Sequence, residues 1–94
     1  MDRRTQKLIW ELMSQRFPAT AVTHPAERGM RLLEEAAECA QAFGVSLLEA
    51  IKIVTRVYSR PAGSRDEELG QTLLVLAAAA ECEGVDLSKL FQNA

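Results

Sequence analysis

The chain has 94 residues, a formal net charge of −2 at pH 7, and a composition that is 48% hydrophobic and 26% charged. These values exclude a disordered chain and predict one folded domain over residues 1–94, whose single small core is marginal enough that we expect self-association. The charge argues against nucleic acid as a partner, and no apolar run approaches the roughly 20 residues of a membrane span, so we expect a cytoplasmic protein without a membrane partner.

The apolar residues recur with helical spacing, and no strand pattern is visible. A first helix is expected from about Arg3 to Phe17, where the segment FPATAVTHP ends it. A second helix is expected to start near Pro25, whose fixed φ suits the first helical position, and to stop at Gly44.

Two capping boxes mark the next two helices. Ser46 with Glu49 opens a third helix, and Ser64 with Glu67 opens a fourth that runs to Gly84. The third helix is expected to end before a proline and to turn its apolar side inward. That side consists of Leu47, Leu48, Ile51, Val54, Val57 and Tyr58.

These helices predict the fold class. With a short last helix over about residues 88–92, they indicate an all-α protein, a mostly antiparallel four-helix bundle with a short C-terminal helix. The fourth helix is apolar nearly all round from Leu73 to Ala80, so we expect it to be the central, enclosed member. Cys39 and Cys82 are expected to be reduced, buried, structural thiols.

The second helix carries an acidic face. At about 100° per residue, Glu34, Glu38 and Glu35 fall within about 100° of one another. Taken alone, this pattern is typical of the solvated face of an amphipathic helix. Arg28 and Arg31 precede it by one turn, and Arg31 is spaced to pair with these glutamates.

The fourth helix repeats the spacing. Glu67, Gln71 and Glu68 relate to one another as Glu34, Glu38 and Glu35 do. The helix dipole favours acids in a first turn, but it does not explain a matching triad on another helix. Carboxylates brought together repel one another unless a cation neutralises them, and Mg²⁺ or Mn²⁺ prefers oxygen ligands. The two triads therefore predict a divalent metal between the second and fourth helices.

Other metal and catalytic classes find no support. Di-iron carboxylate bundles need Glu-x-x-His pairs, and the only histidine, His24, precedes Pro25 as a helix-entry residue. No P-loop, Rossmann glycine fingerprint or Ser/His/Asp arrangement is present.

The segments EEAAE (34–38) and EELGQTLLVLAAAAECEGVDL (67–87) resemble the MazG-like all-α nucleotide pyrophosphohydrolases, over nearly the whole chain. The segment VYSRPAGS is similar to a compact type found in phage and bacterial genomes. The resemblance implies a Mg²⁺-dependent enzyme, with Mn²⁺ as an alternative, that hydrolyses a nucleoside triphosphate to the monophosphate and pyrophosphate. It also implies a homodimer, with a tetramer as the alternative.

Site residues follow from the resemblance position by position. Glu35, Glu38 and Glu68 are expected to be metal ligands and catalytic residues, and Glu34 a further ligand or the residue that orients the attacking water. The fourth ligand of the family is an aspartate, whereas this chain has Gln71. An amide oxygen can still bind a cation but adds no charge, so we expect reduced activity.

This departure keeps two other functions open. One is a non-catalytic module on the same fold that has lost a ligand and binds nucleotide, metal or protein. For the metal site itself, Glu67, one turn before Gln71, is placed to compensate for the missing charge. The other is a structural helical dimer whose acids only confer solubility.

Basic residues near the acidic turn are candidates for binding substrate phosphate. Lys52, Arg56 and Arg60 are spaced as a stripe along the third helix, and Arg60 and Arg65 flank the SRPAGS loop. The alternative is a solvated surface. The aromatic residues Trp10, Phe17 and Tyr58 could stack on a base, but core packing is the favoured interpretation.

Overall fold

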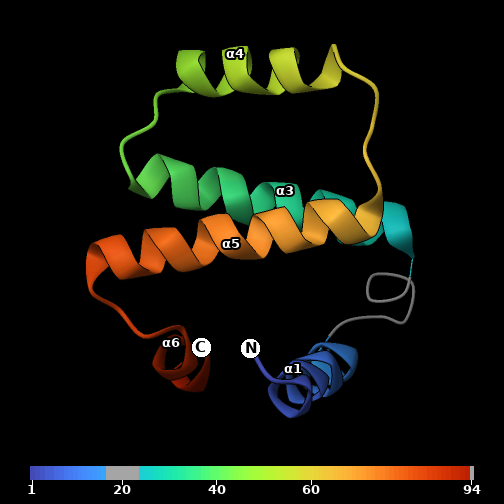
Figure 1. The fold of residues 1–94 in the computed structure, drawn as a ribbon, viewed down its shortest axis with the longest axis vertical. Helices are drawn as coiled ribbons and strands as arrows, with labels where there is room; N and C mark the ends of the chain where they lie inside the picture. The colour runs from blue at the N-terminus through green and yellow to red at the C-terminus, as the bar shows by residue number, and fades with distance from the viewer. Residues whose placement is uncertain (17–23, 94) are drawn as a thin grey trace. The chain divides into compact units, whose positions relative to one another are not determined.

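The computed structural model describes residues 1–16 and 24–93, with the backbone alone for 91–93, and contains only helices and connecting segments in those ranges (Figure 1). The all-α prediction is confirmed. Phe17 and most of the FPATAVTHP segment lie outside the described residues. The helices are α1 (Arg3–Arg16), α3 (Pro25–Ala42), α4 (Leu47–Tyr58), α5 (Arg65–Glu83) and α6 (Leu87–Asn93). None of these helices is long and apolar enough to cross a membrane.

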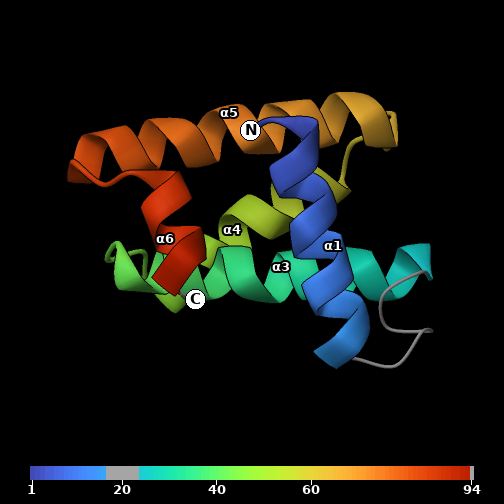
Figure 2. The same cartoon turned by 90° about the horizontal axis from the view of Figure 1, so that it is seen from below.

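The chain divides into two compact units, Met1–Thr55 and Arg56–Ala94, with the division inside α4. The four-helix bundle remains a prediction. In the second unit the chain turns after Gly84, so that α6 runs across the axis of α5 (Figure 2).

Side-chain caps fix where three of the helices begin. The Ser46 hydroxyl accepts a hydrogen bond from the Glu49 amide at 3.2 Å, and the Ser64 hydroxyl accepts one from the Glu67 amide at 3.2 Å, as the capping boxes predict. At α1, the Asp2 carboxylate accepts the Thr5 amide at 2.8 Å, and this hydrogen bond lowers the pKa of Asp2. Each cap satisfies an amide that would otherwise lack an intrahelical partner.

His24 and Pro25 open α3 without a side-chain cap. His24 is the N-cap residue and Pro25 the first helical residue, which confirms the helix-entry interpretation of His24. Proline fits this position because its missing N–H would have no helical partner there.

Glycines end α3 and α5. Gly84 adopts φ 71°, and the following Val85 amide donates to the Ala80 carbonyl at 3.0 Å. The same pattern closes α3 around Gly44, whose φ is 93°. Both are Schellman motifs, which satisfy terminal carbonyls and need a left-handed residue that glycine adopts without steric penalty.

Alanine substitutions at Gly70, inside α5, and at Gly84, its C-cap, are expected to change the free energy of unfolding in opposite directions. Gly84→Ala should lower the free energy of unfolding by about 1–2 kcal/mol, because an L-residue is strained in the left-handed region. Gly70→Ala should raise it by about 0.5–1 kcal/mol, because Gly70 is inside the helix and a Cβ there meets no atom within 4 Å. Urea denaturation followed by circular dichroism measures both. Equal effects of the two substitutions would contradict this assignment of the helix end.

Burial within one chain is slight. Among the side chains that the structure describes, Ala80 is the one buried apolar residue, at 8% exposed. Within its own unit α5 is not covered by α6, since Leu74 is 64% exposed and Val75 69%, and the prediction that α5 is the enclosed member of a bundle stays a prediction. The inward side predicted for α4 is also uncovered, with Leu47 at 77% and Tyr58 at 76%.

Both thiols and the aromatic side chains Trp10 and Tyr58 are exposed as well. Cys39 and Cys82 are free but exposed, which corrects the prediction of buried thiols. Trp10 is 47% exposed and Tyr58, the last residue of α4, is 76% exposed, so neither side chain is buried. Each of these side chains therefore lies on an exposed helix face.

Candidate metal and phosphate site

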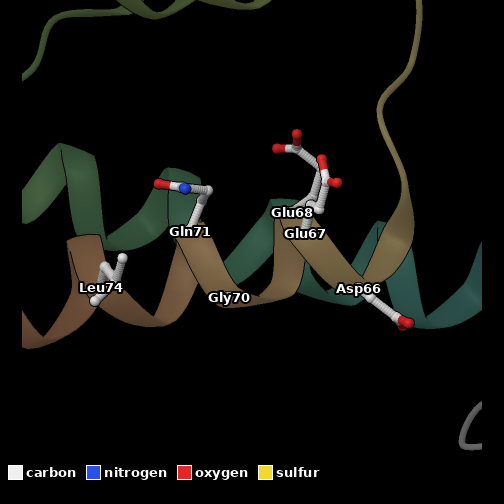
Figure 3. Close-up of a pocket in the computed structure, with 6 residues that line it drawn as sticks. All are labelled: Asp66, Glu67, Glu68, Gly70, Gln71 and Leu74. Carbon is white, nitrogen blue, oxygen red and sulfur yellow. The ribbon is translucent and has the colours of Figure 1, made fainter.

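The acidic first turn of α5 is the clearest chemical feature of the second unit. Figure 3 shows Glu67, Glu68 and Gln71 projecting from one side of α5, whereas Asp66 points away from them. The predicted common face of these three residues is therefore present. Together with Asp66, Gly70 and Leu74, these residues line a shallow, open hollow along the helix.

The loop before α5 approaches Glu68 closely at Gly63. A Cβ added to Gly63 would lie 2.7 Å from the Glu68 Oε1 atom, closer than a real Cβ contact allows. Any other residue at position 63 would therefore move the Glu68 carboxylate. This role of Gly63 was not predicted, and its one signal in the sequence is a glycine directly before the helix cap Ser64.

The acidic face of α3 lies in the first unit. Glu34, Glu35 and Glu38 are all in the helix and all exposed, as a solvated face or an accessible binding face requires. Like charges three or four residues apart destabilise a helix by about 0.2–0.5 kcal/mol per pair. The triad therefore lowers the stability of α3 unless a cation or a basic group offsets it.

The described residues do not present a preformed metal site. In residues 1–16 and 24–93, no group of three or more His, Cys, Asp or Glu side chains lies close enough to hold a metal ion. The α3 triad belongs to one unit and the α5 triad to the other, and neither helix alone supplies the ligands. Binding of Mg²⁺ or Mn²⁺ by Glu34, Glu35, Glu38, Glu68 and Gln71 together remains a prediction.

The basic candidates differ in their surroundings. Lys52 on α4 forms an ion pair with Glu49, with 3.7 Å between Nζ and Oε1 and both side chains about 60% exposed, so the pair is weak. Arg56 lies on the same helix. Arg60 does not lie on α4. The helix ends at Tyr58, and the proline that follows Arg60 disfavours helical backbone at this residue. The predicted stripe is therefore wrong for Arg60, whereas Arg65 is the first residue of α5.

No protein-family model, curated protein or solved structure matches the chain. The likeness to MazG-like proteins therefore rests on the acidic motifs and the helix order alone.

Proposed function

We propose that the chain is a divalent-metal-dependent nucleoside triphosphate pyrophosphohydrolase with a MazG-like four-helix fold. Its reaction adds water across the anhydride between the α- and β-phosphates, giving the nucleoside monophosphate and pyrophosphate. The observation that carries the proposal is the pair of acidic triads, which have the same spacing and stand on exposed helix faces.

The proposed roles follow the chemistry of the side chains. Glu35, Glu38 and Glu68 are carboxylates, the oxygen ligands that Mg²⁺ prefers, and Glu34 would hold the attacking water. Arg65, next to the acidic turn, is the best placed of the basic candidates for a phosphate. It precedes Glu68 by three residues on α5, so the two side chains lie on neighbouring parts of the helix surface.

A substrate panel tests this proposal directly. The purified chain is incubated with ribo- and deoxynucleoside triphosphates in Mg²⁺, in Mn²⁺ and in a chelator, and the products are separated by anion exchange. We expect monophosphate and pyrophosphate in equal amounts, and no turnover with the chelator. Release of inorganic phosphate with a diphosphate would contradict the proposed bond cleavage, and no turnover with any substrate would contradict the enzyme.

Gln71 favours a second candidate, a non-catalytic module that binds metal or nucleotide. The amide replaces a charged ligand of the family, which lowers the negative charge on the α5 face. A native-state ligand raises apparent stability, so Mn²⁺ should then raise the unfolding midpoint in the absence of any turnover.

A further inference from the structure

Gly63 lies beside the end of the Glu68 side chain, at the start of α5. A Cβ on Gly63 would lie 2.7 Å from the Glu68 Oε1 atom and 3.5 Å from both its Cδ and its Cγ, and these are the three atoms nearest to it. Both residues belong to the second unit, and the contact is local to the loop and the first turn of the helix. The Glu68 side chain therefore occupies the space that a side chain at position 63 would fill.

The backbone of Gly63 does not itself require glycine. Among the described residues, the glycines with positive φ are Gly44 and Gly84, and Gly63 is not one of them. Outside the positive-φ region glycine has no steric advantage over other residues. The space beside the Glu68 carboxylate is thus the one requirement for glycine at position 63 that the described residues show.

The cap of α5 holds the loop and the helix in a fixed relation. The Ser64 hydroxyl accepts the Glu67 amide at 3.2 Å, and the Ser64 carbonyl accepts the Glu68 amide at 3.0 Å. On the other side of Gly63, Pro61 has a fixed φ. A Cβ at position 63 would therefore displace the flexible carboxylate rather than the loop. The displacement is about 0.7 Å or more, the difference between 2.7 Å and the 3.4 Å at which ordinary contact begins.

We propose that Gly63 is a positioning residue for the Glu68 carboxylate, because its missing side chain leaves room for the orientation in which Glu68 serves the candidate site. A binding group has to be held within about 0.5 Å of its productive geometry, and the expected displacement exceeds that limit. Replacing a residue that orients a ligand typically costs about 10–100-fold in affinity. The inference rests on the proposed function for what Glu68 binds, whereas the orientation of Glu68 can be measured without any ligand.

Nuclear magnetic resonance of the chain without added metal measures that orientation. In the unmodified chain we expect a nuclear Overhauser effect between the Gly63 Hα and Glu68 Hγ protons. In Gly63→Ala we expect changed three-bond couplings for the χ1 and χ2 angles of Glu68. Gly70→Ala is the matched control, because it adds the same methyl group to α5 where a Cβ meets no atom within 4 Å, and it should leave these couplings unchanged. Absence of the Overhauser effect, or unchanged couplings in Gly63→Ala, would overturn the proposal.

Mn²⁺ binding, followed by paramagnetic resonance, separates this proposal from the proposed function. Glu68→Gln alone should weaken binding if Glu68 is a ligand. Gly63→Ala should weaken binding about tenfold in the unmodified chain and have no further effect in the Glu68→Gln background, because both act through one carboxylate. A general structural role of Gly63 would instead lower the unfolding midpoint and weaken binding in both backgrounds, which would overturn the proposal.

The two single variants decide which proposal fails. If Glu68→Gln weakens Mn²⁺ binding and Gly63→Ala does not, the positioning role is wrong and the proposed function stands. If Glu68→Gln has no effect, the ligand assignment of the proposed function is wrong, and the Glu68 couplings alone decide whether Gly63 orients the carboxylate.

Discussion

Glu38→Ala is expected to lower kcat/KM for the best nucleoside triphosphate by about 100-fold or more, because the proposed function makes Glu38 a metal ligand, whose loss removes several kcal/mol of transition-state stabilisation. Glu38 is the carboxylate that both Glu34 and Glu35 neighbour at helical spacing, so it is the centre of the α3 triad. The folding of the chain should not suffer, since Glu38 is exposed and alanine favours helix. Pyrophosphate release measures the activity, and circular dichroism measures the helix content.

Two controls separate charge from position. Glu38→Gln keeps the shape of the side chain and removes its charge, so it should lose nearly as much activity as alanine. Glu83→Ala removes a carboxylate from the last turn of α5, away from the acidic first turn, and should leave activity within about twofold of the unmodified chain. Full activity in Glu38→Ala would exclude the α3 triad from the reaction.

The local structure of this chain could be predicted from its sequence, because each helix end depends on chemistry within a few residues. Ser64 caps α5 through an amide three residues away, and Gly84 ends it through a left-handed φ. The same reasoning located His24 and Pro25 at the start of α3. Such signals need no long-range contact, and the helix boundaries agree with the sequence to within about two residues.

Burial could not be predicted in the same way. Periodicity shows which side of a helix is apolar, as it does for Leu47 and Ile51, but it does not show what covers that side. We expected other helices of the same chain to cover the apolar sides, and Leu74 and Val75 are exposed. The apolar side of a helix could therefore be predicted, whereas its cover depends on packing between segments far apart in the sequence.

The geometry of the candidate site could likewise be predicted only where it depends on a single helix. Helix geometry alone puts Glu67, Glu68 and Gln71 on one side of α5, and Figure 3 agrees. The distance from these residues to the α3 triad depends on packing between units, which residue spacing does not encode. The contact between Gly63 and Glu68 also escaped prediction, since it depends on the path of the SRPAGS loop.

Gln71→Asp is expected to raise the metal affinity of the site and, with it, the activity. Adding a carboxylate one turn from Glu67 and Glu68 restores the charge that the amide lacks. An added unit charge about 4 Å from a divalent ion in a water-exposed site contributes about 2 kcal/mol and should lower the half-saturating Mg²⁺ concentration roughly thirtyfold. The measurement is turnover as a function of Mg²⁺ concentration, with Mn²⁺ binding followed separately by its paramagnetic resonance.

Gln71→Asn is the matched control for this gain, because asparagine has the shape of aspartate without its charge. It should leave the Mg²⁺ requirement unchanged or raise it, so that a gain in aspartate alone identifies charge as the cause. Glu67→Gln in the unmodified chain should weaken metal binding if Glu67 compensates for the amide, and have little effect in the Gln71→Asp background. If Gln71→Asp bound Mn²⁺ more tightly yet gave no turnover, the α5 face would be a metal-binding surface and the second candidate function would replace the first. If it changed neither binding nor turnover, the acidic turn would serve only to stabilise the start of α5 through the helix dipole.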